Sequence, residues 1–262
     1  MEDNIDFLSS IVNGILNEEF SIVYQPIFEL EKQKIISVES LVRWNKYGKE
    51  IGANVFISKL EEAKLIYLLD YYVLDKVMMV ISQWQLRIIR IVPVSINISK
   101  STILRSDFIE ILKSKIKEYK INSNYIVLEL TERENIEENM EEFCNVIREI
   151  RKLGVRISID DFGVGTANIL LLSNINFDYL KVDKFLIDNI YNDERVKIFL
   201  EAINKIVEIS NANAIMEGIE TKQQLQTVIN YGYKYGQGYY LSRPKSAEQL
   251  ENALILNTLK NN

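Results

Sequence analysis

Two adjacent carboxylates, Asp160 and Asp161, follow an apolar segment and precede Phe162 and Gly163. Residues 155–159 alternate β-branched and polar side chains, which is the period of a pleated strand. Two neighbouring carboxylates repel each other unless both are solvated or a cation lies between them. Taken alone, the pair therefore fits either a solvated turn or a metal site.

Other polar residues interrupt or end apolar, strand-like segments in the same way. Besides the aspartate pair, these residues are Glu39, Asn97, Glu129, Lys181, Glu217 and Gln237. Carboxylates and an amide oxygen are the hard ligands that Mg²⁺ and Mn²⁺ prefer. An Asp-Asp pair among three further acids can bridge two such ions about 3.5–4 Å apart, which is the arrangement used for in-line phosphoryl displacement.

Lys181 is the one cation in this set. Its ammonium group could orient an attacking water or neutralise charge on a phosphate. A salt bridge to Asp160 or Asp161 would explain the same residue without a catalytic role. On residue chemistry alone, both interpretations stay open.

The segments that must position these residues alternate between strand and helix along the chain. Periodicity predicts strands near residues 21–28, 35–44, 91–98, 125–130, 155–160, 177–182, 213–219 and 233–240. Helical patterns cover residues 5–17, 54–66, 68–86, 107–119, 137–152, 169–172, 194–209, 222–230 and 246–259. The short connection at residues 31–34 predicts that the first two strands are antiparallel. Pro26 in the first strand suits a sheet edge or a strand end.

This order predicts an α/β protein with a (β/α)8 TIM-like barrel and an antiparallel first strand. The carboxyl ends of barrel strands converge on one mouth, where the polar residues named above would meet. A doubly wound sheet is the alternative, although no glycine-rich fingerprint follows the first strand. Because no repeat or linker divides the chain, we expect one domain over residues 1–262, with the helix within residues 1–20 packed on the barrel.

The composition excludes several classes of function. The net charge of −6 disfavours binding to a nucleic acid polymer. The chain has no histidine, so acid–base chemistry falls to Asp, Glu, Lys, Tyr or water. The single cysteine, Cys144, cannot form an internal disulfide, and no apolar run is long enough for a membrane segment. With an acidic start that is unlike a signal peptide, a cytoplasmic protein is expected.

The run Glu39-Ser40-Leu41-Val42-Arg43-Trp44 resembles the Glu-x-Leu-x-Arg-Trp signature of the EAL domain family. Further matches follow in the family's order and extend from about residue 20 to about residue 250. They are Tyr24-Gln25-Pro26-Ile27, Asn97-Ile98-Ser99, Glu129-Leu130-Thr131-Glu132, Asp160-Asp161-Phe162-Gly163, Leu180-Lys181-Val182-Asp183, Glu217-Gly218-Ile219-Glu220-Thr221 and Gln237-Gly238-Tyr239.

The resemblance implies hydrolysis of the bacterial second messenger cyclic di-GMP to linear pGpG with two Mg²⁺ or Mn²⁺ ions. It assigns one metal to Glu39, Asn97, Glu129 and Asp160, and the second to Asp160, Asp161 and Glu217. Lys181 would position or deprotonate the attacking water, and Gln237 would hydrogen-bond beside it. The substrate-binding residues would be Gln25, Leu41, Arg43 and Asp183, with the Arg43 guanidinium on a phosphate. A homodimer and a separate regulatory or sensory partner are implied as well.

One segment departs from the family pattern. After Asp-Asp-Phe-Gly the family usually has Thr-Gly, an aromatic residue and Ser-Ser, whereas residues 164–168 here are Val-Gly-Thr-Ala-Asn. Ala53 also stands where a proline is common, and Met216 stands where alanine is usual. These changes leave an alternative to the enzyme, namely a catalytically silent EAL domain that acts as a cyclic di-GMP receptor.

Overall fold

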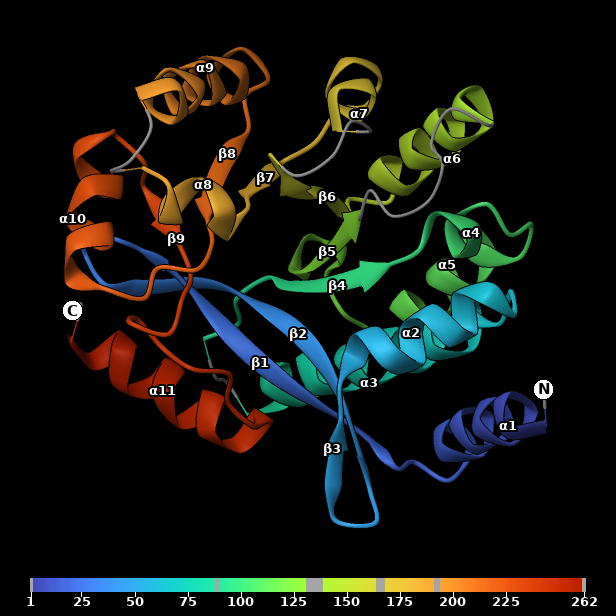
Figure 1. The fold of residues 1–262 in the computed structure, drawn as a ribbon. Coiled ribbons are helices and arrows are strands. Elements are labelled where there is room, and N and C mark those ends of the chain that lie inside the picture. Colours follow the sequence, from blue (N-terminus) through green and yellow to red (C-terminus); the bar gives the residue numbers. More distant parts are fainter. Residues whose placement is uncertain (1, 88–89, 131–138, 164–167, 191–193, 261–262) are drawn as a thin grey trace.

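A computed structural model describes residues 2–87, 90–130, 139–163, 168–190 and 194–260. Its strands form one nine-stranded sheet in the order β1-β9-β8-β7-β6-β5-β4-β2-β3, and a further β1–β2 pairing closes all of them except β3 into a barrel. Helices surround this barrel on the outside (Figure 1). The strands are β1 (Phe20–Glu29), β2 (Lys34–Lys46), β3 (Lys49–Ile51), β4 (Val94–Ile98), β5 (Ile126–Leu130), β6 (Arg156–Phe162), β7 (Tyr179–Val182), β8 (Asn213–Met216) and β9 (Tyr235–Gly236).

The helices follow the strands in alternation for most of the chain. They are α1 (Glu2–Leu16), α2 (Ala53–Glu62), α3 (Ile66–Leu86), α4 (Lys100–Ile103), α5 (Phe108–Tyr119), α6 (Met140–Lys152), α7 (Asn168–Asn174), α8 (Lys184–Asp188), α9 (Glu194–Ile209), α10 (Lys222–Asn230) and α11 (Ala247–Lys260). The short helices α4 and α8 were not predicted, because four or five residues are too few to show a helical period.

The barrel confirms the predicted fold class, a (β/α)8 TIM-like barrel with an antiparallel first strand. Strand β1 runs antiparallel to both β2 and β9, while β2 and the strands from β4 to β9 pair in parallel. Parallel strands are covered on both faces, and every residue of β5 is accordingly buried. A charged residue in such a strand needs partners inside the barrel.

The hairpin of β2 and β3 is a feature that the sequence did not predict. Tyr47 and Gly48 connect the two strands with positive φ angles of 51° and 73°, the backbone geometry of a tight hairpin turn. The hairpin projects from the barrel in Figure 1. Because its polar residues bury little apolar surface, they carry no strand-like alternation.

Pro26 lies within β1, opposite Val38, and not at the strand end; its position is edge-like, because β1 pairs with β9 only at Phe28 and Glu29. The backbone of Tyr24 exchanges hydrogen bonds of 2.7 and 2.8 Å with Lys245, on the side of β1 away from β2. Residues two apart face the same way, so the nitrogen of Pro26 also faces away from β2. The proline therefore removes no hydrogen bond from the β1–β2 ladder.

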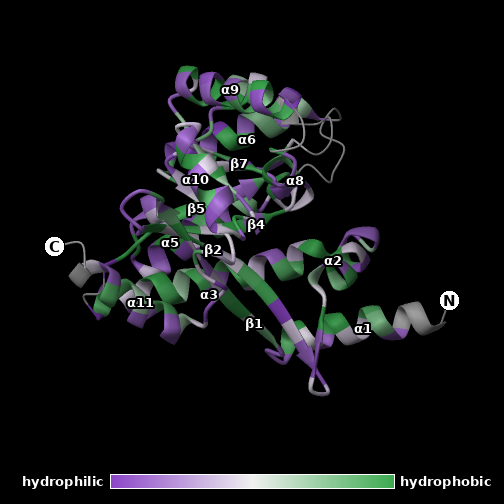
Figure 2. Cartoon of the chain, turned by 60° about the vertical axis from the view of Figure 1, so that its left-hand side comes forward, coloured by the Kyte–Doolittle hydropathy of each residue, from purple (hydrophilic) through white to green (hydrophobic). Residues whose placement is uncertain are grey.

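The core consists of the apolar faces of the helices packed on the strands. Green and purple residues alternate around the outer helices in Figure 2, as expected for helices with one buried face. Trp44 at the end of β2 is fully buried, stacks on Phe20 at 5.1 Å and lies 5.9 Å from Phe7 of α1. Cys144 is buried and forms no disulfide, as expected for the single cysteine of the chain. No helix among the described residues has the length and apolar character needed to cross a membrane.

The last two barrel strands are shorter than predicted. Strand β8 ends at Met216 and β9 contains only Tyr235 and Gly236, so Glu217 and Gln237 lie directly beyond them. The segments that follow β8 and β9 approach each other very closely, and a Cβ on Gly238 would lie 2.1 Å from the backbone oxygen of Ile219. Only glycine permits this approach, which ends the sheet and brings both side chains to the barrel mouth.

Candidate active site

Lys181 of β7 lies at the centre of four carboxylates from other strand ends. Its Nζ is 2.8 Å from Glu217 Oε1, 3.1 Å from Asp160 Oδ1 and 3.3 Å from Glu39 Oε2, and it also contacts Glu129 Oε1. The Lys181 side chain is only 2% exposed. The salt bridge to Asp160 considered from the sequence is thus present, but it is one of four ion pairs.

The side-chain amides of Gln237 and Asn97 complete this group, which we call the carboxylate ring. Gln237 Nε2 donates hydrogen bonds of 2.7 Å to both Glu39 Oε2 and Glu217 Oε1, so it joins carboxylates from two distant parts of the chain. Asn97 Nδ2 lies 3.4 Å from Glu39 Oε1. The parallel register of β4 and β5 sets Asn97 directly beside Glu129. The strands therefore bring the predicted ligands together.

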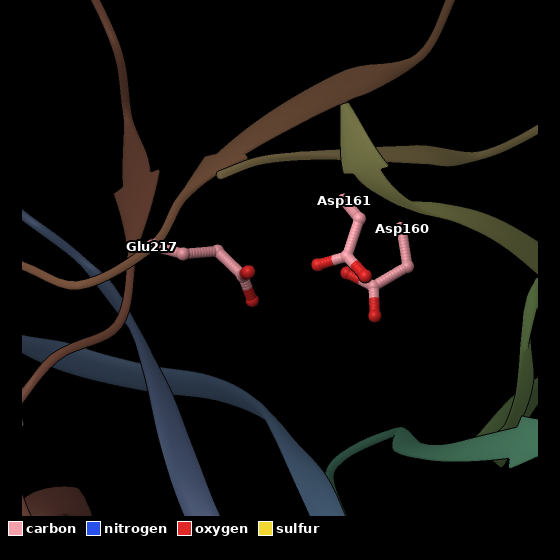
Figure 3. Close-up of side chains that lie close together, drawn as sticks. All are labelled: Asp160, Asp161 and Glu217. Atoms are coloured by element: carbon pink, nitrogen blue, oxygen red, sulfur yellow. The ribbon is translucent and has the colours of Figure 1, made fainter. Parts of the chain in front are cut away.

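An irregularity in β6 lets the neighbouring aspartates face the same space. Successive strand residues normally point to opposite faces. The β6–β7 register shifts between Ile159 and Phe162, and Asp161 has a left-handed φ of 53°. Aspartate tolerates this conformation better than most residues. As a result, carboxylate oxygens of Asp160, Asp161 and Glu217 lie within 4.8 Å of one another (Figure 3).

Burial and charge shift the ionisation of this group. Burial raises the pKa of Glu129 well above its ordinary value, and Lys181 only partly offsets that rise. Burial likewise raises the pKa of Glu217 to about 8, with Asp160 and Glu39 adding to the effect. Burial by itself would lower the pKa of Lys181, but the surrounding carboxylates outweigh it, and that pKa lies well above its ordinary value. Lys181 therefore stays protonated while its neighbours compete for one positive charge.

The donor set fits divalent cations. Four carboxylates contact the Lys181 ammonium and a fifth, Asp161, lies beside Asp160 and Glu217, so the site has an excess of acidic groups over its one ammonium that a metal would relieve. Glu129 Oε2 and Gln237 Oε1 are buried and accept no hydrogen bond from the described residues. Buried oxygens without a donor are costly unless a ligand satisfies them. The ring could therefore hold Mg²⁺ or Mn²⁺ through oxygen ligands.

The ring forms one wall of a pocket of about 400 Å³. Of the residues predicted as metal ligands, catalytic groups or substrate-binding residues, those lining it are Gln25, Glu39, Leu41, Arg43, Asn97, Asp160, Asp161, Lys181, Glu217 and Gln237. Glu129 has no exposed surface and lies against Lys181, away from the pocket surface. Asp183 does not line this pocket; its Oδ1 caps α8 by accepting the Phe185 N–H at 2.7 Å. Its predicted contact with substrate stays a prediction.

The sequence profile of the EAL domain matches residues 9–244, which is most of the chain. The chain belongs to the EAL domain family. Among curated relatives, the oxygen sensor protein DosP of Escherichia coli (strain K12) is 28% identical over 244 residues, or 92% of this chain and 30% of DosP. The cyclic di-GMP phosphodiesterase PA2567 of Pseudomonas aeruginosa is 30% identical over 250 residues, or 94% of this chain and 42% of that protein.

The structural comparison agrees with this assignment. The EAL enzyme Bd1971, in a form with cAMP and cyclic di-GMP bound, superposes with a TM-score of 0.87 at 27% identity, covering 96% of this chain and 69% of that chain. The chain spans less than half the length of the two curated relatives.

Two acidic residues of this EAL domain's pocket were not predicted from the sequence, Glu61 of α2 and Asp70 of α3. Asp70 lies four residues after Ile66 and three before Val73, both buried, on the stripe that packs α3 against the barrel. An acid on an apolar helix stripe is the signal that could have identified Asp70. Glu61 gives no such signal, because it lies near the charged end of α2 with Lys59 and Glu62. The altered segment at residues 164–167 lies outside the described residues.

Proposed function

We propose that this EAL domain is a metal-dependent phosphodiesterase that hydrolyses cyclic di-GMP to linear pGpG. The observation that carries the proposal is the buried ring of carboxylates and Gln237 around Lys181, open to a pocket at the barrel mouth. The name of the relative PA2567 supports the reaction, and the ligand-bound form of Bd1971 supports cyclic di-GMP as the ligand.

Two Mg²⁺ or Mn²⁺ ions are the proposed cofactors. Glu39, Asn97, Glu129 and Asp160 would hold one ion, and Asp160, Asp161 and Glu217 would hold the other. Bound divalent ions would neutralise phosphate charge and lower the pKa of water. The short separation of the Asp160, Asp161 and Glu217 oxygens supports a shared cation among these three.

Lys181 has the properties of a positioning and charge-neutralising group. Because its pKa is raised, its ammonium keeps its three N–H donors near neutral pH. A protonated ammonium can orient a water molecule by donating a hydrogen bond to it. Both roles expected from the sequence, positioning and deprotonating the water, stay proposals, because cations bound to the same carboxylates would lower the pKa of Lys181. Gln237 would keep Glu39 and Glu217 in place through its two hydrogen bonds.

Arg43 lines the pocket and is the proposed phosphate-binding residue. Its Nη1 donates to Val42 O at 2.9 Å, and its Nε lies 3.7 Å from Glu50 on β3, so the side chain is held while remaining 25% exposed. A guanidinium can donate two parallel hydrogen bonds to a phosphate, whereas an ammonium acts as a point charge. Gln25 and Leu41 would line the same binding surface.

Replacing Arg43 with lysine is expected to raise KM for cyclic di-GMP about tenfold and to change kcat by less than about threefold. The reason is that lysine cannot donate the two parallel hydrogen bonds to the phosphate, and this loss weakens the ground state and the transition state alike. Steady-state kinetics at saturating Mn²⁺ measures both constants. Arg87→Lys is the matched control, since Arg87 is exposed and pairs with Glu251 instead. A fall in kcat without a rise in KM would assign Arg43 to the reacting phosphate rather than to substrate binding.

Product analysis in H₂¹⁸O tests the proposed reaction. Attack of water on one phosphorus breaks the P–O3′ bond and leaves a 5′-phosphate, so pGpG should carry one ¹⁸O atom. The parent chain with Mn²⁺ should form this product, and Glu39→Gln should not, because Glu39 contacts Lys181, Gln237 and Asn97 together. Binding of intact cyclic di-GMP without any product, with either Mg²⁺ or Mn²⁺, would instead identify a receptor. A cytoplasmic homodimer with a separate regulatory partner stays a prediction.

A further inference from the structure

Asp70 of α3 forms a buried cluster with the turn that follows β4. Its side chain is nearly inaccessible, with the residue 6% exposed. One oxygen, Oδ2, accepts hydrogen bonds from the Ser99 N–H at 3.1 Å, the Ser99 hydroxyl at 2.6 Å and the Thr102 hydroxyl at 2.6 Å. Charge-assisted hydrogen bonds of this kind are shorter and stronger than neutral ones. We call Asp70, Ser99 and Thr102 the α3 clamp.

The clamp fixes the start of α4. Ser99 is the N-cap of that helix, and its hydroxyl accepts the Thr102 N–H at 3.3 Å. A four-residue helix has little stability of its own, since a single turn pays the full cost of nucleation. Asp70 therefore holds the Ser99 backbone and the Thr102 hydroxyl, from a helix that supplies no residue of the carboxylate ring.

The clamp lies two residues from Asn97, whose amide belongs to that ring. Ile98 separates Asn97 from Ser99 and is itself buried, so its packing restrains the strand end between them. Asn97 is the residue that β4 contributes to the ring, and the strand register places it beside Glu129. A shift of the Ser99 backbone would move the Asn97 amide relative to Glu39, from which it is 3.4 Å away. Even a small displacement of the Asn97 amide would matter, because metal ligands need close positioning.

We propose that Asp70 is a positioning residue for the metal site, acting through Ser99 and Thr102 to hold the Asn97 amide in the ring. The inference rests on the proposed function in so far as the ring binds divalent metal. A purely structural Asp70 would stabilise the packing of α3 on the barrel and leave metal affinity unchanged. The two roles therefore differ in a binding measurement that needs no turnover.

The test compares Asp70→Asn, Thr102→Val and Thr102→Ser with the control Asp75→Asn. Asp75 is five residues further along α3 and pairs with Lys115 and Tyr119 of α5, so the same substitution on the same helix leaves the β4–α4 turn untouched. Asparagine keeps the shape of Asp70 but removes its charge, and valine keeps the shape of Thr102 but removes its hydroxyl. Serine restores the hydroxyl. Mn²⁺ affinity is measured without substrate from the electron paramagnetic resonance signal of free Mn²⁺, beside the melting temperature of each chelator-treated protein.

Asp70→Asn and Thr102→Val should bind Mn²⁺ about tenfold more weakly than the parent chain, at the lower end of the effect of residues that support metal ligands. Asp75→Asn and Thr102→Ser should match the parent. Excess Mn²⁺ should restore turnover in Asp70→Asn. Unchanged Mn²⁺ affinity with a lowered melting temperature would overturn the proposal and leave Asp70 a packing residue. Weakened Mn²⁺ binding in Asp70→Asn and Thr102→Val, together with a parent chain that forms no pGpG, would support the clamp and contradict the proposed hydrolysis.

Discussion

Replacing Lys181 with methionine is expected to lower kcat for cyclic di-GMP hydrolysis by about 100- to 1,000-fold, the usual cost of losing one preorganised donor at a reacting centre. Methionine has a similar length and fills the buried space, but it carries neither charge nor N–H groups. In the structure the ammonium contacts four carboxylates and is buried at the barrel mouth. Chromatographic separation of cyclic di-GMP and pGpG over time measures the loss.

The same substitution should separate catalysis from stability. Without metal, the Lys181→Met chain keeps its buried carboxylates without a counter-charge, and breaking a buried pair typically costs about 3–5 kcal/mol. Added Mn²⁺ should recover most of that stability, because it supplies the missing positive charge, while turnover stays low. Lys76→Met is the control: Lys76 pairs with exposed Glu18, and such a surface pair contributes at most about 1 kcal/mol. Turnover of Lys181→Met within about threefold of the parent would show that Lys181 is not a catalytic residue.

Replacing Glu129 with glutamine is expected to abolish most hydrolysis while leaving the metal-free protein as stable as before, or more stable. Because burial raises the pKa of Glu129, ionising it opposes folding at every pH above the ordinary value for glutamate. Glutamine has the shape of the protonated acid and removes that cost. It also removes a charged ligand, so Mn²⁺ affinity and turnover should each fall by about 100-fold or more.

Two measurements on the same samples test this prediction. Denaturant unfolding in chelator gives the stability of the metal-free protein, and titration gives its Mn²⁺ affinity. Glu149→Gln provides the control, as Glu149 is an exposed residue of α6 whose partner is Lys152. A strong loss of stability in metal-free Glu129→Gln would show that the carboxylate is ionised and needed by Lys181 in the folded protein. Parent-like Mn²⁺ affinity would exclude Glu129 as a metal ligand.

The location of the site could be predicted because polar residues are conspicuous in buried strands. Glu129 interrupts a strand in which every residue is buried, and Lys181 lies next to the end of another, so a barrel was expected to bring them to the same mouth. The antiparallel first strand likewise followed from a short hairpin connection. These predictions depended on local pattern and on the closure of one sheet.

The remaining features depend on contacts between distant segments. The left-handed backbone of Asp161 follows from the register shift against β7, which no local pattern encodes. Gln237 was predicted to lie in this set, but its hydrogen bond to Glu39, 198 residues away in the sequence, could not be read from any local pattern. Asp70 was overlooked since its partners are in the turn after β4, and only the fold places that turn against α3. The periodicity of α3 marks Asp70 as unusual but does not identify what it binds.

The most direct test of the account is the metal dependence of hydrolysis by the parent chain. Chelator-treated protein is mixed with cyclic di-GMP, and pGpG formation is followed as Mn²⁺ is added, with bound Mn²⁺ counted in the same samples. We predict no product in chelator, and product that rises together with Mn²⁺ bound to the ring, up to two ions per chain. Equal rates in excess chelator, or no pGpG at saturating Mn²⁺, would contradict the claim that this carboxylate ring is a metal-dependent phosphodiesterase site.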